Sequence, residues 1–205
     1  DGVLLSHVNL SVVRGEFIYL IGKSGAGKTT LLQIIGTLDR PNSGQVVIDG
    51  EDVLKLNDTE MAKFRNQHIG FIFQFHQLLP EFTALENVMM PALIGGWNRK
   101  KASERATELL KSLNLADRLT HKPQQLSGGE QQRVAAARAL MMSPKVILAD
   151  EPSGSLDEAN KKELNQLLLF LREKYGQTIL IVTHDKELAE ISNRVIEMRD
   201  GQIID

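Results

Sequence analysis

The fold of this chain is decided by the stretch Gly22-Lys23-Ser24-Gly25-Ala26-Gly27-Lys28-Thr29. It matches the phosphate-binding pattern G-x-x-x-x-G-K-[ST], and it lies between two apolar runs, at residues 16–21 and 30–35. The first run is typical of a buried strand and the second of a helix. Backbone N–H groups of such a loop point at a phosphate group, and the following helix adds the positive end of its dipole. The stretch therefore predicts a strand–loop–helix unit that binds phosphate.

The residue types at the end of this stretch predict a nucleotide with a bound magnesium ion. Lys28 would neutralise the β- and γ-phosphates of ATP, and the Thr29 hydroxyl would hold the Mg²⁺ that bridges them. Thr30 would contact a phosphate or simply continue the helix. A glycine-rich loop that only turns the chain is the alternative, which is disfavoured because the fixed positions of the pattern seldom match by chance.

The composition indicates a single globular domain. At 205 residues the chain is long enough for one hydrophobic core, and its 42% hydrophobic and 24% charged residues are typical of globular proteins. The formal net charge of -2 and the lack of a long Lys/Arg run argue against nucleic acid as a ligand. No apolar run approaches the roughly 20 residues needed to cross a bilayer. The chain has no Cys, which excludes disulfides and thiolate chemistry.

The hydrophobic pattern alternates between strand-like and helix-like segments. Further strands are predicted at residues 46–48, 69–73, 146–149 and 178–182. Residues 83–140 have helical spacing, with an apolar stripe at Ala102, Ala106, Leu109, Leu110 and Leu113, and an amphipathic helix is predicted around residues 164–171. Gly95-Gly96 is the most linker-like point. Alternating strands and helices favour a parallel sheet with a helical insertion.

Two adjacent acids follow the predicted strand at residues 146–149. In open α/β sheets, ligands bind at the carboxyl ends of the strands, so Asp150 and Glu151 are expected beside the phosphate loop. Asp150 fits a direct or water-mediated contact with Mg²⁺, and Glu151 could accept a proton from the water that attacks the γ-phosphate. An ordinary acidic turn at a strand end is the alternative.

A second glycine-containing stretch reads Leu126-Ser127-Gly128-Gly129-Glu130-Gln131-Gln132-Arg133. Ser127 is a good helix N-cap, and Gly128 and Gly129 permit the close approach of an anion, so this is a second candidate phosphate-binding helix end. A capped helix without a ligand is the alternative. The stretch is similar to the LSGGQ signature of ABC ATPases. The resemblance implies a head-to-tail homodimer in which each ATP lies between one phosphate loop and the partner's signature, with Ser127, Gly128, Gly129 and Glu130 binding nucleotide.

Other positions resemble the same family in order and spacing. Gln74 resembles the glutamine that contacts Mg²⁺ or its water and faces a membrane partner, although a lone Gln is usually a surface residue. Ser155-Leu156-Asp157 resembles the loop that crosses the dimer interface, and it is also compatible with a helix N-cap turn. His184 resembles the switch histidine that bonds the γ-phosphate and orients the attacking water, although a histidine at a strand end is usually structural.

The resemblance covers essentially the whole chain and implies a fold. The expected fold is α/β, with a RecA-like P-loop NTPase core, a mainly parallel sheet, an N-terminal antiparallel β portion and an inserted α-helical subdomain. One domain, residues 1–205, would comprise a nucleotide-binding core at residues 1–74 and 145–205. Residues 75–144 would form the helical subdomain that carries the signature.

Residues 73–80 and 83–88 resemble one group of ABC ATPases in particular. This group includes the ATPases of lipoprotein-releasing, macrolide-exporting and cell-division complexes, and the lipoprotein-releasing ones are the most similar. The resemblance implies an ATPase that uses ATP and Mg²⁺ at the cytoplasmic face of the bacterial inner membrane. It also implies integral membrane permease-type subunits as partners, with motion passed to them through residues 74–90. No nucleic acid partner is expected.

Two other classes of protein compete with this interpretation. A soluble ABC ATPase acting on DNA or the ribosome usually has two cassettes, a long coiled coil or a zinc insertion, and this chain has one signature and no Cys. A P-loop kinase would have no use for the signature or for His184.

The sequence departs from the family pattern at a few positions. Glu130 replaces Gln in the signature, and Ser153 and Ser155 replace the more usual Thr and Asn. An adenine-stacking aromatic is expected upstream of Asp1, so the chain looks truncated at its N-terminus. Loss of that ring would weaken adenine binding by about 0.5–1.5 kcal/mol, by analogy with aromatic pairs.

Overall fold

The structure is a computed structural model that describes residues 5–73, 76–154, 156, 158–183 and 187–204. Its centre is a six-stranded sheet with the order β4-β5-β6-β1-β7-β8. The strands are β1 (Phe17–Ile21), β4 (Ile69–Phe73), β5 (Val146–Asp150), β6 (Thr178–Val182), β7 (Arg194–Arg199) and β8 (Gln202–Ile204). Neighbouring strands pair in parallel except β7 and β8, which are antiparallel. The predicted α/β fold with a mainly parallel sheet is therefore confirmed.

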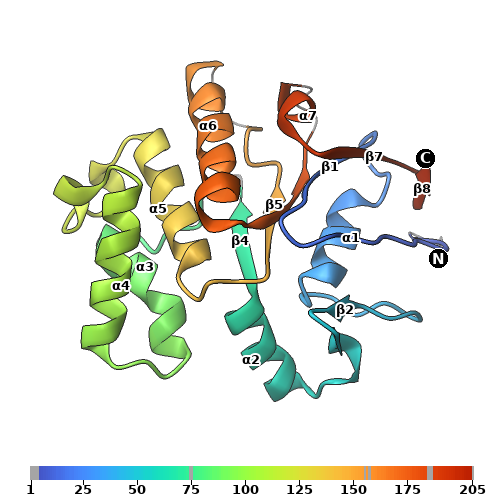
Figure 1. Ribbon diagram of the computed structural model, residues 1–205, viewed down its shortest axis with the longest axis horizontal. Helices are drawn as coiled ribbons and strands as arrows, with labels where there is room; N and C mark the ends of the chain where they lie inside the picture. The colour runs from blue at the N-terminus through green and yellow to red at the C-terminus, as the bar shows by residue number, and fades with distance from the viewer. Residues whose placement is uncertain (1–4, 74–75, 155, 157, 184–186, 205) are drawn as a thin grey trace.

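A small antiparallel sheet and a set of helices complete the described part of the chain (Figure 1). The small sheet pairs β2 (Val47–Ile48) with β3 (Glu51–Asp52), and it is the antiparallel portion expected near the N-terminus. The α-helices are α1 (Lys28–Ile35), α2 (Asp58–His68), α3 (Ala84–Ile94), α4 (Arg99–Ser112), α5 (Gly128–Leu140), α6 (Glu158–Tyr175) and α7 (Glu187–Ile191). Short 3-10 turns occur at Val53–Lys55, Ala116–Arg118 and Pro123–Gln125.

Alternate residues of β1 enter two hydrophobic cores. Phe17 and Tyr19 belong to the core shared with α5 and α6, whereas Ile18 and Leu20 belong to the core shared with α1. The two cores lie on opposite faces of the sheet because side chains alternate along a strand, and Figure 1 shows α1 and α5 on opposite sides. All four side chains are 0% exposed. The strand that leads into the phosphate loop is therefore anchored from both faces.

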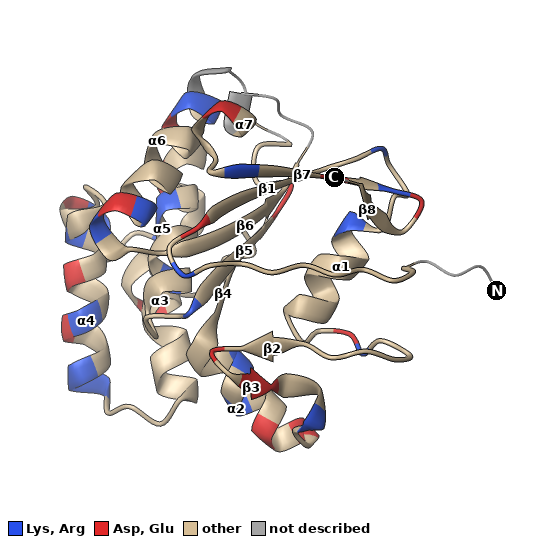
Figure 2. Ribbon diagram, turned by 45° about the vertical axis from the view of Figure 1, so that its right-hand side comes forward, with Lys and Arg blue, Asp and Glu red and all other residues tan. Residues whose placement is uncertain are grey.

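The helices α3, α4 and α5 pack against one another beside the sheet. The predicted apolar stripe of α4 faces this contact: Ala102, Ala106, Leu109, Leu110 and Leu113 are at most 3% exposed. Lys/Arg and Asp/Glu positions both occur along α4 (Figure 2), as expected for the solvent side of an amphipathic helix. Asn98 caps this helix by accepting a hydrogen bond from the N–H of Lys101.

The structure corrects the interpretation of Gly95-Gly96 as a linker. Gly95 is the C-cap of α3, and its N–H donates to the carbonyl oxygens of Pro91 and Leu93. Gly96 has φ 81°, a left-handed conformation that suits glycine at a helix end. The two glycines therefore end one helix and begin a short turn to α4, which packs directly against α3.

Residues 58–68 form a helix, α2, that the sequence analysis missed. Only Met61 and Phe64 of this helix are buried, so its apolar pattern is weak. Its start carries a usable signal, however, because Asn57 and Glu60 form a reciprocal capping box. Strands β3, β7 and β8 were also missed, and β7 and β8 lie at one edge of the main sheet.

Within the described ranges, no helix combines the length and the apolar character needed to span a membrane.

Candidate nucleotide site

The phosphate loop connects β1 to α1 as predicted, and glycines are required at both of its ends. A Cβ on Gly22 would lie 2.2 Å from the carbonyl oxygen of Met198, so a side chain cannot fit there. Gly27 has φ 96° and is the N-cap of α1. Among the described residues no side chain caps α1, and no acid lies in its first turn. The first N–H groups of α1 are therefore left for a ligand.

Lys28 is the buried cation of this loop. The residue is 6% exposed, and its Nζ donates to the carbonyl oxygens of Gly22 at 2.7 Å and Lys23 at 3.0 Å. A buried ammonium needs such partners because desolvation is costly. The loop thus wraps its own cation and concentrates positive charge where the glycines permit a phosphate to approach.

The turn between β7 and β8 supports the other side of the loop. The N–H of Gly201 donates to the carbonyl oxygen of Ala26 at 3.1 Å. A cavity opens between these two segments, lined by Lys23, Ser24, Gly25, Ala26, Glu197, Met198, Arg199 and Asp200. The loop is therefore accessible from this side.

The acids predicted for metal binding and catalysis lie at the carboxyl end of β5, next to the start of α1. Thr29 Oγ1 donates to Asp150 Oδ1 at 3.4 Å, which joins two motifs that are 121 residues apart in the sequence. Burial raises the pKa of Asp150 above its usual value. The hydrogen bond from Thr29 opposes this rise, the neighbouring Glu151 adds to it, and Lys28 has the smallest effect, which lowers the pKa. Glu151 has φ 44°, a costly conformation for a residue with a side chain, and its N–H donates to the carbonyl oxygen of Val182 at 2.7 Å.

These residues fit a magnesium ion held together with a nucleotide. The half-buried carboxylate of Asp150 and the hydroxyl of Thr29 supply the hard oxygen ligands that Mg²⁺ prefers. The parts of the chain that the structure describes hold no group of three or more His, Asp or Glu side chains able to bind a metal on their own. This agrees with the usual way that proteins bind Mg²⁺, through one or two side chains plus phosphate oxygens and water.

The signature stretch forms the start of α5, as predicted. Ser127 Oγ accepts from the N–H of Glu130 at 3.2 Å, and the N–H of Ser127 donates to Glu130 Oε2 at 2.8 Å, so the two residues form a capping box. Arg118 Nε donates to the other carboxylate oxygen of Glu130 at 2.8 Å. The hydrogen bond from the backbone of Ser127, followed by Arg118, holds the pKa of Glu130 below its usual range.

The two glycines of the signature have different surroundings. A Cβ on Gly129 would lie 2.6 Å from Glu163 Oε2, the end of a flexible side chain on α6 that would have to move aside. A Cβ on Gly128 would meet no atom within 4 Å, and Gly128 is exposed. The backbone at Gly128 is therefore open to a ligand from outside the chain.

Four of the predicted positions lie outside the described residues: Gln74, Ser155, Asp157 and His184. Their roles stay predictions. Strands β4 and β6 end at Phe73 and Val182, close to the strand ends predicted ahead of Gln74 and His184.

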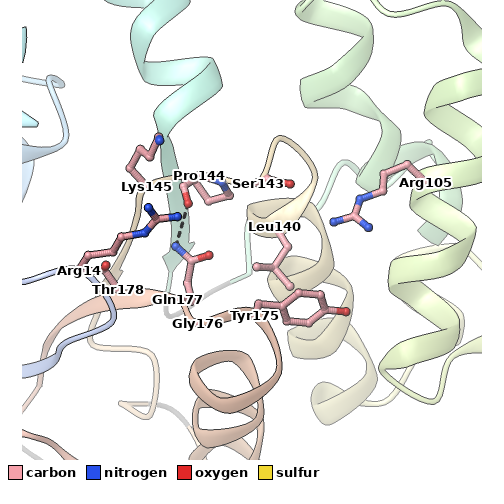
Figure 3. A pocket seen from close by; sticks show the side chains of 10 residues that line it. All are labelled: Arg14, Arg105, Leu140, Ser143, Pro144, Lys145, Tyr175, Gly176, Gln177 and Thr178. Atoms are coloured by element: carbon pink, nitrogen blue, oxygen red, sulfur yellow. Dashed lines mark hydrogen bonds between the residues drawn. The ribbon is translucent and has the colours of Figure 1, made fainter. Parts of the chain in front are cut away.

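A separate cavity lies at the amino ends of the parallel strands, opposite the end that carries Asp150 (Figure 3). It is lined by Arg14, Arg105, Leu140, Ser143, Pro144, Lys145, Tyr175, Gly176, Gln177 and Thr178. Several of these residues precede β5 and β6, so they belong to the amino ends of the parallel strands. Gln177 Nε2 donates to the carbonyl oxygen of Pro144 at 3.0 Å, and Lys145 pairs with Asp49 at 2.7 Å. No residue of the phosphate loop takes part, so this cavity is not the nucleotide site.

A glycine-rich loop on a central parallel strand, with acids at the end of a nearby strand, defines a P-loop nucleotide-binding domain. Comparison with known families gives the class more closely: the ABC transporter family matches residues 5–154. The chain belongs to this family and is an ABC-type ATPase that binds ATP. The predicted resemblance to ABC ATPases is thereby confirmed.

Individual relatives cover almost the whole chain. The lipoprotein-releasing system ATP-binding protein LolD of Bacteroides fragilis is 59% identical over 98% of this chain and 93% of that protein. LolD of Porphyromonas gingivalis is 60% identical over 97% of this chain and 90% of that protein. Among solved structures, a dimeric post-hydrolysis state of the ATP-binding cassette MJ0796 with ADP and Pi has a TM-score of 0.86 at 44% identity, covering 98% of this chain and 89% of that one.

Proposed function

We propose that this chain is the ATP-hydrolysing subunit of a membrane complex that releases lipoproteins. Its partners would be integral membrane permease-type subunits, and it would act at the cytoplasmic face of the bacterial inner membrane. The supporting observation for the cargo is that relatives at 59% and 60% identity, matched over nearly their full length, are ATP-binding proteins of lipoprotein-releasing systems.

The contact between Thr29 and Asp150 carries the proposal for hydrolysis. Lys28 and the N–H groups at the start of α1 would bind the β- and γ-phosphates, and Thr29 and Asp150 would hold Mg²⁺. The metal would neutralise charge that develops on the transferred phosphoryl group. Glu151, next in the chain after Asp150, would accept the proton of the attacking water. Gln74 and His184 complete the proposed site on the basis of their sequence positions.

The nucleotide site would be completed by a second copy of the chain. Within one chain the starts of α1 and α5 belong to helices packed on opposite faces of the sheet, so the two helix ends have separate positions (Figure 1). A head-to-tail homodimer would bring the exposed Ser127 and Gly128 of one protomer to the phosphates held by the other. The dimeric state of a cassette that is 44% identical supports this arrangement.

The chain would work as one domain with two parts. Residues 1–74 and 145–205 would form the nucleotide-binding core, and residues 75–144 would form a helical subdomain that carries the signature. The packing of α3, α4 and α5 against one another supports this division. Residues 74–90 would pass the closure and opening of the dimer to the membrane subunits.

The variant Glu151→Gln tests hydrolysis and dimerisation together. We expect the turnover rate to fall by about 100-fold or more, which is the typical effect of losing a general base. Binding of Mg-ATP should persist, and light scattering should show that a dimer accumulates. Glu173→Gln is a matched control because Glu173 lies on α6 with its side chain 71% exposed. Normal hydrolysis by Glu151→Gln, or ATP-bound protein that remains monomeric, would contradict the proposal.

Reconstitution tests the cargo. The chain, copurified with its membrane subunits, would be placed in vesicles that contain a fluorescent lipoprotein, and release would be measured after adding ATP. We expect release with the native chain and none with Glu151→Gln. ATP hydrolysis without lipoprotein release would refute the proposed cargo, and copurification with ribosomes or DNA instead of membrane subunits would favour the alternative soluble ABC ATPase.

A further inference from the structure

Two adjacent residues after β4 have an unusual backbone conformation. His76 has φ 54° and Gln77 has φ 47°, so both are in the left-handed region although neither is glycine. This region is costly for residues with a Cβ, and a consecutive pair persists only where the surroundings hold it. The N–H of His76 donates to the carbonyl oxygen of Phe73, the last residue of β4, at 3.1 Å.

The surroundings that hold this pair come from α5. Arg138, in the last turn of α5, donates through Nη2 to the carbonyl oxygen of His76 at 2.8 Å and through Nη1 to that of Gln77 at 2.7 Å. One guanidinium group therefore bonds both residues of the left-handed pair. The planar fork of arginine holds two N–H donors in a fixed geometry, whereas the donors of a lysine ammonium all radiate from one nitrogen.

Arg138 is a partly buried cation whose described partners are carbonyl oxygens. Within the described ranges no carboxylate forms an ion pair with it, and burial lowers its pKa. Removing a cation from water without a counter-charge is costly, so the two carbonyl oxygens must compensate. A strained backbone pair and a desolvated arginine thus depend on each other.

The far end of the same segment is held separately. Asn87 of α3 is 0% exposed, and its side chain bonds both the N–H and the carbonyl oxygen of Leu79 at 2.8 and 3.1 Å. Its Nδ2 also donates to the carbonyl oxygens of Phe82 and Thr83. The segment from residue 76 to residue 83 is therefore tied to α3 at one end and to α5 at the other.

We propose that Arg138 is a positioning residue that couples α5 to the segment after Gln74. Helix α5 is capped by Ser127 of the signature at its start, and it carries Arg138 in its last turn. A displacement of α5 when the signature engages ATP is passed through the guanidinium group to this segment, which continues towards the proposed membrane partner. This inference rests on the proposed function and adds a residue that none of the family motifs includes.

Steady-state ATP hydrolysis by Arg138→Met tests the inference. We expect kcat to fall about tenfold while the KM for ATP changes less than about twofold, because misplaced catalytic geometry costs rate whereas Lys28 and the loop still bind nucleotide. Arg138→Lys keeps the charge but not the fork, and it is expected to be impaired nearly as much.

Relief of the backbone strain separates coupling from simple strain relief. In the triple variant His76→Gly, Gln77→Gly, Arg138→Met, glycines adopt the left-handed region without strain. We expect this variant to remain as impaired as Arg138→Met, because glycines do not replace the guanidinium link between α5 and this segment. Recovery of kcat to within about threefold of native would show that Arg138 only holds strained residues in place, which would overturn the inference.

Arg65→Met is the matched control. Arg65 of α2 likewise donates to the carbonyl oxygen of a left-handed non-glycine residue, Thr37 with φ 56°, but away from this segment. We expect it to lower the melting temperature without a comparable loss of kcat. If both arginine variants lower kcat equally, the effect is general destabilisation and the inference is wrong.

Amide hydrogen exchange in Arg138→Lys and ATP hydrolysis by the native chain are two further measurements that test the inference. If Arg138→Met does not fold, Arg138→Lys is used, with amide hydrogen exchange at residues 76–79 expected to rise relative to native. Unchanged exchange together with unchanged kcat would overturn the inference. A native chain that hydrolyses no ATP would instead refute the proposed function, so the two failures are distinguishable.

Discussion

The helices α1 and α5 both begin at glycines, but their first turns are built in opposite ways. The start of α1 has a glycine N-cap, no acid in its first turn and no side-chain cap from any residue that the structure describes. The start of α5 has a serine cap, a capping box and Glu130, whose carboxylate is itself paired with Arg118. The N–H groups in the first turn of α1 can therefore bind an anion. In the first turn of α5, the N–H of Glu130 already donates to the side chain of Ser127.

This difference indicates a division of labour between the two helix ends. The phosphate loop, with its buried Lys28, is equipped to bind nucleotide within one chain. The start of α5 has weaker attraction for an anion because an acid lies in its first turn. We infer that α5 contributes only after the other protomer presents a bound nucleotide, which would make closure of the dimer depend on ATP.

The largest expected effect is on the α1 side. Lys28→Ala should weaken ATP binding on the order of 100-fold, because charge-assisted hydrogen bonds to the phosphates are lost. Isothermal titration with Mg-ATP measures the affinity, and a thermal melt checks that the loop still folds. Binding within about threefold of native would show that α1 is not the main anion site.

A smaller effect is expected for Gly128→Ala, which probes the exposed backbone of the α5 end. The fold should tolerate the methyl group because no atom lies within 4 Å of its position. We expect ATP-dependent dimerisation in the Glu151→Gln background to weaken about tenfold, by crowding the approaching phosphate, with little change in ATP binding by the monomer. Sedimentation velocity measures the dimer. An unchanged dimer would show that no ligand approaches Gly128.

Loss of the α5 cap should affect stability moderately. Ser127→Ala removes the side-chain oxygen that accepts from the N–H of Glu130, and N-cap removal typically costs about 0.5–2 kcal/mol. Urea denaturation gives the change in the free energy of unfolding. No comparable substitution exists at the start of α1, where the cap is Gly27, so the result sharpens the contrast between the two helix ends.

The smallest expected effect concerns the ion pair at the α5 end. Arg118 and Glu130 are 41% and 18% exposed, and such a pair is worth about 0.2–1 kcal/mol. Arg118→Gln should weaken ATP-dependent dimerisation a few-fold by leaving the Glu130 charge uncompensated near the phosphates, but should have little effect in a Glu130→Gln background. Equal effects of Arg118→Gln in both backgrounds would show that Arg118 does not act by offsetting that charge.

Local patterns in the sequence predicted the main elements well. The strands at residues 69–73 and 178–182 have the predicted bounds, and β5 extends the predicted strand by one residue to Asp150. These strands were recognisable because both faces of the sheet are covered, which requires nearly continuous apolar runs. Helix α2 and strand β7 were missed because they are partly exposed: two residues of α2 are buried, and Val195 of β7 is 43% exposed.

Residues that act through contacts with other segments of the chain could not be predicted in the same way. Arg138 bonds a carbonyl oxygen 62 residues away, and Arg118 bonds a carboxylate 12 residues away. Nothing in the residue type distinguishes them from the other cations of the chain, because any Lys or Arg can lie in solvent. Their partners become visible only when α5 is packed against the rest of the helices and the end of β4.

The sequence by itself determined the phosphate loop, the acids after β5 and the glycines of the signature, because each depends on residues adjacent in the chain. Only the tertiary structure decided that Thr29 meets Asp150, that Lys28 is buried in its own loop, and that Arg138 holds two strained residues. These features depend on the free energy of packing and desolvation between segments that are distant in the sequence. Local sequence patterns do not predict these contacts.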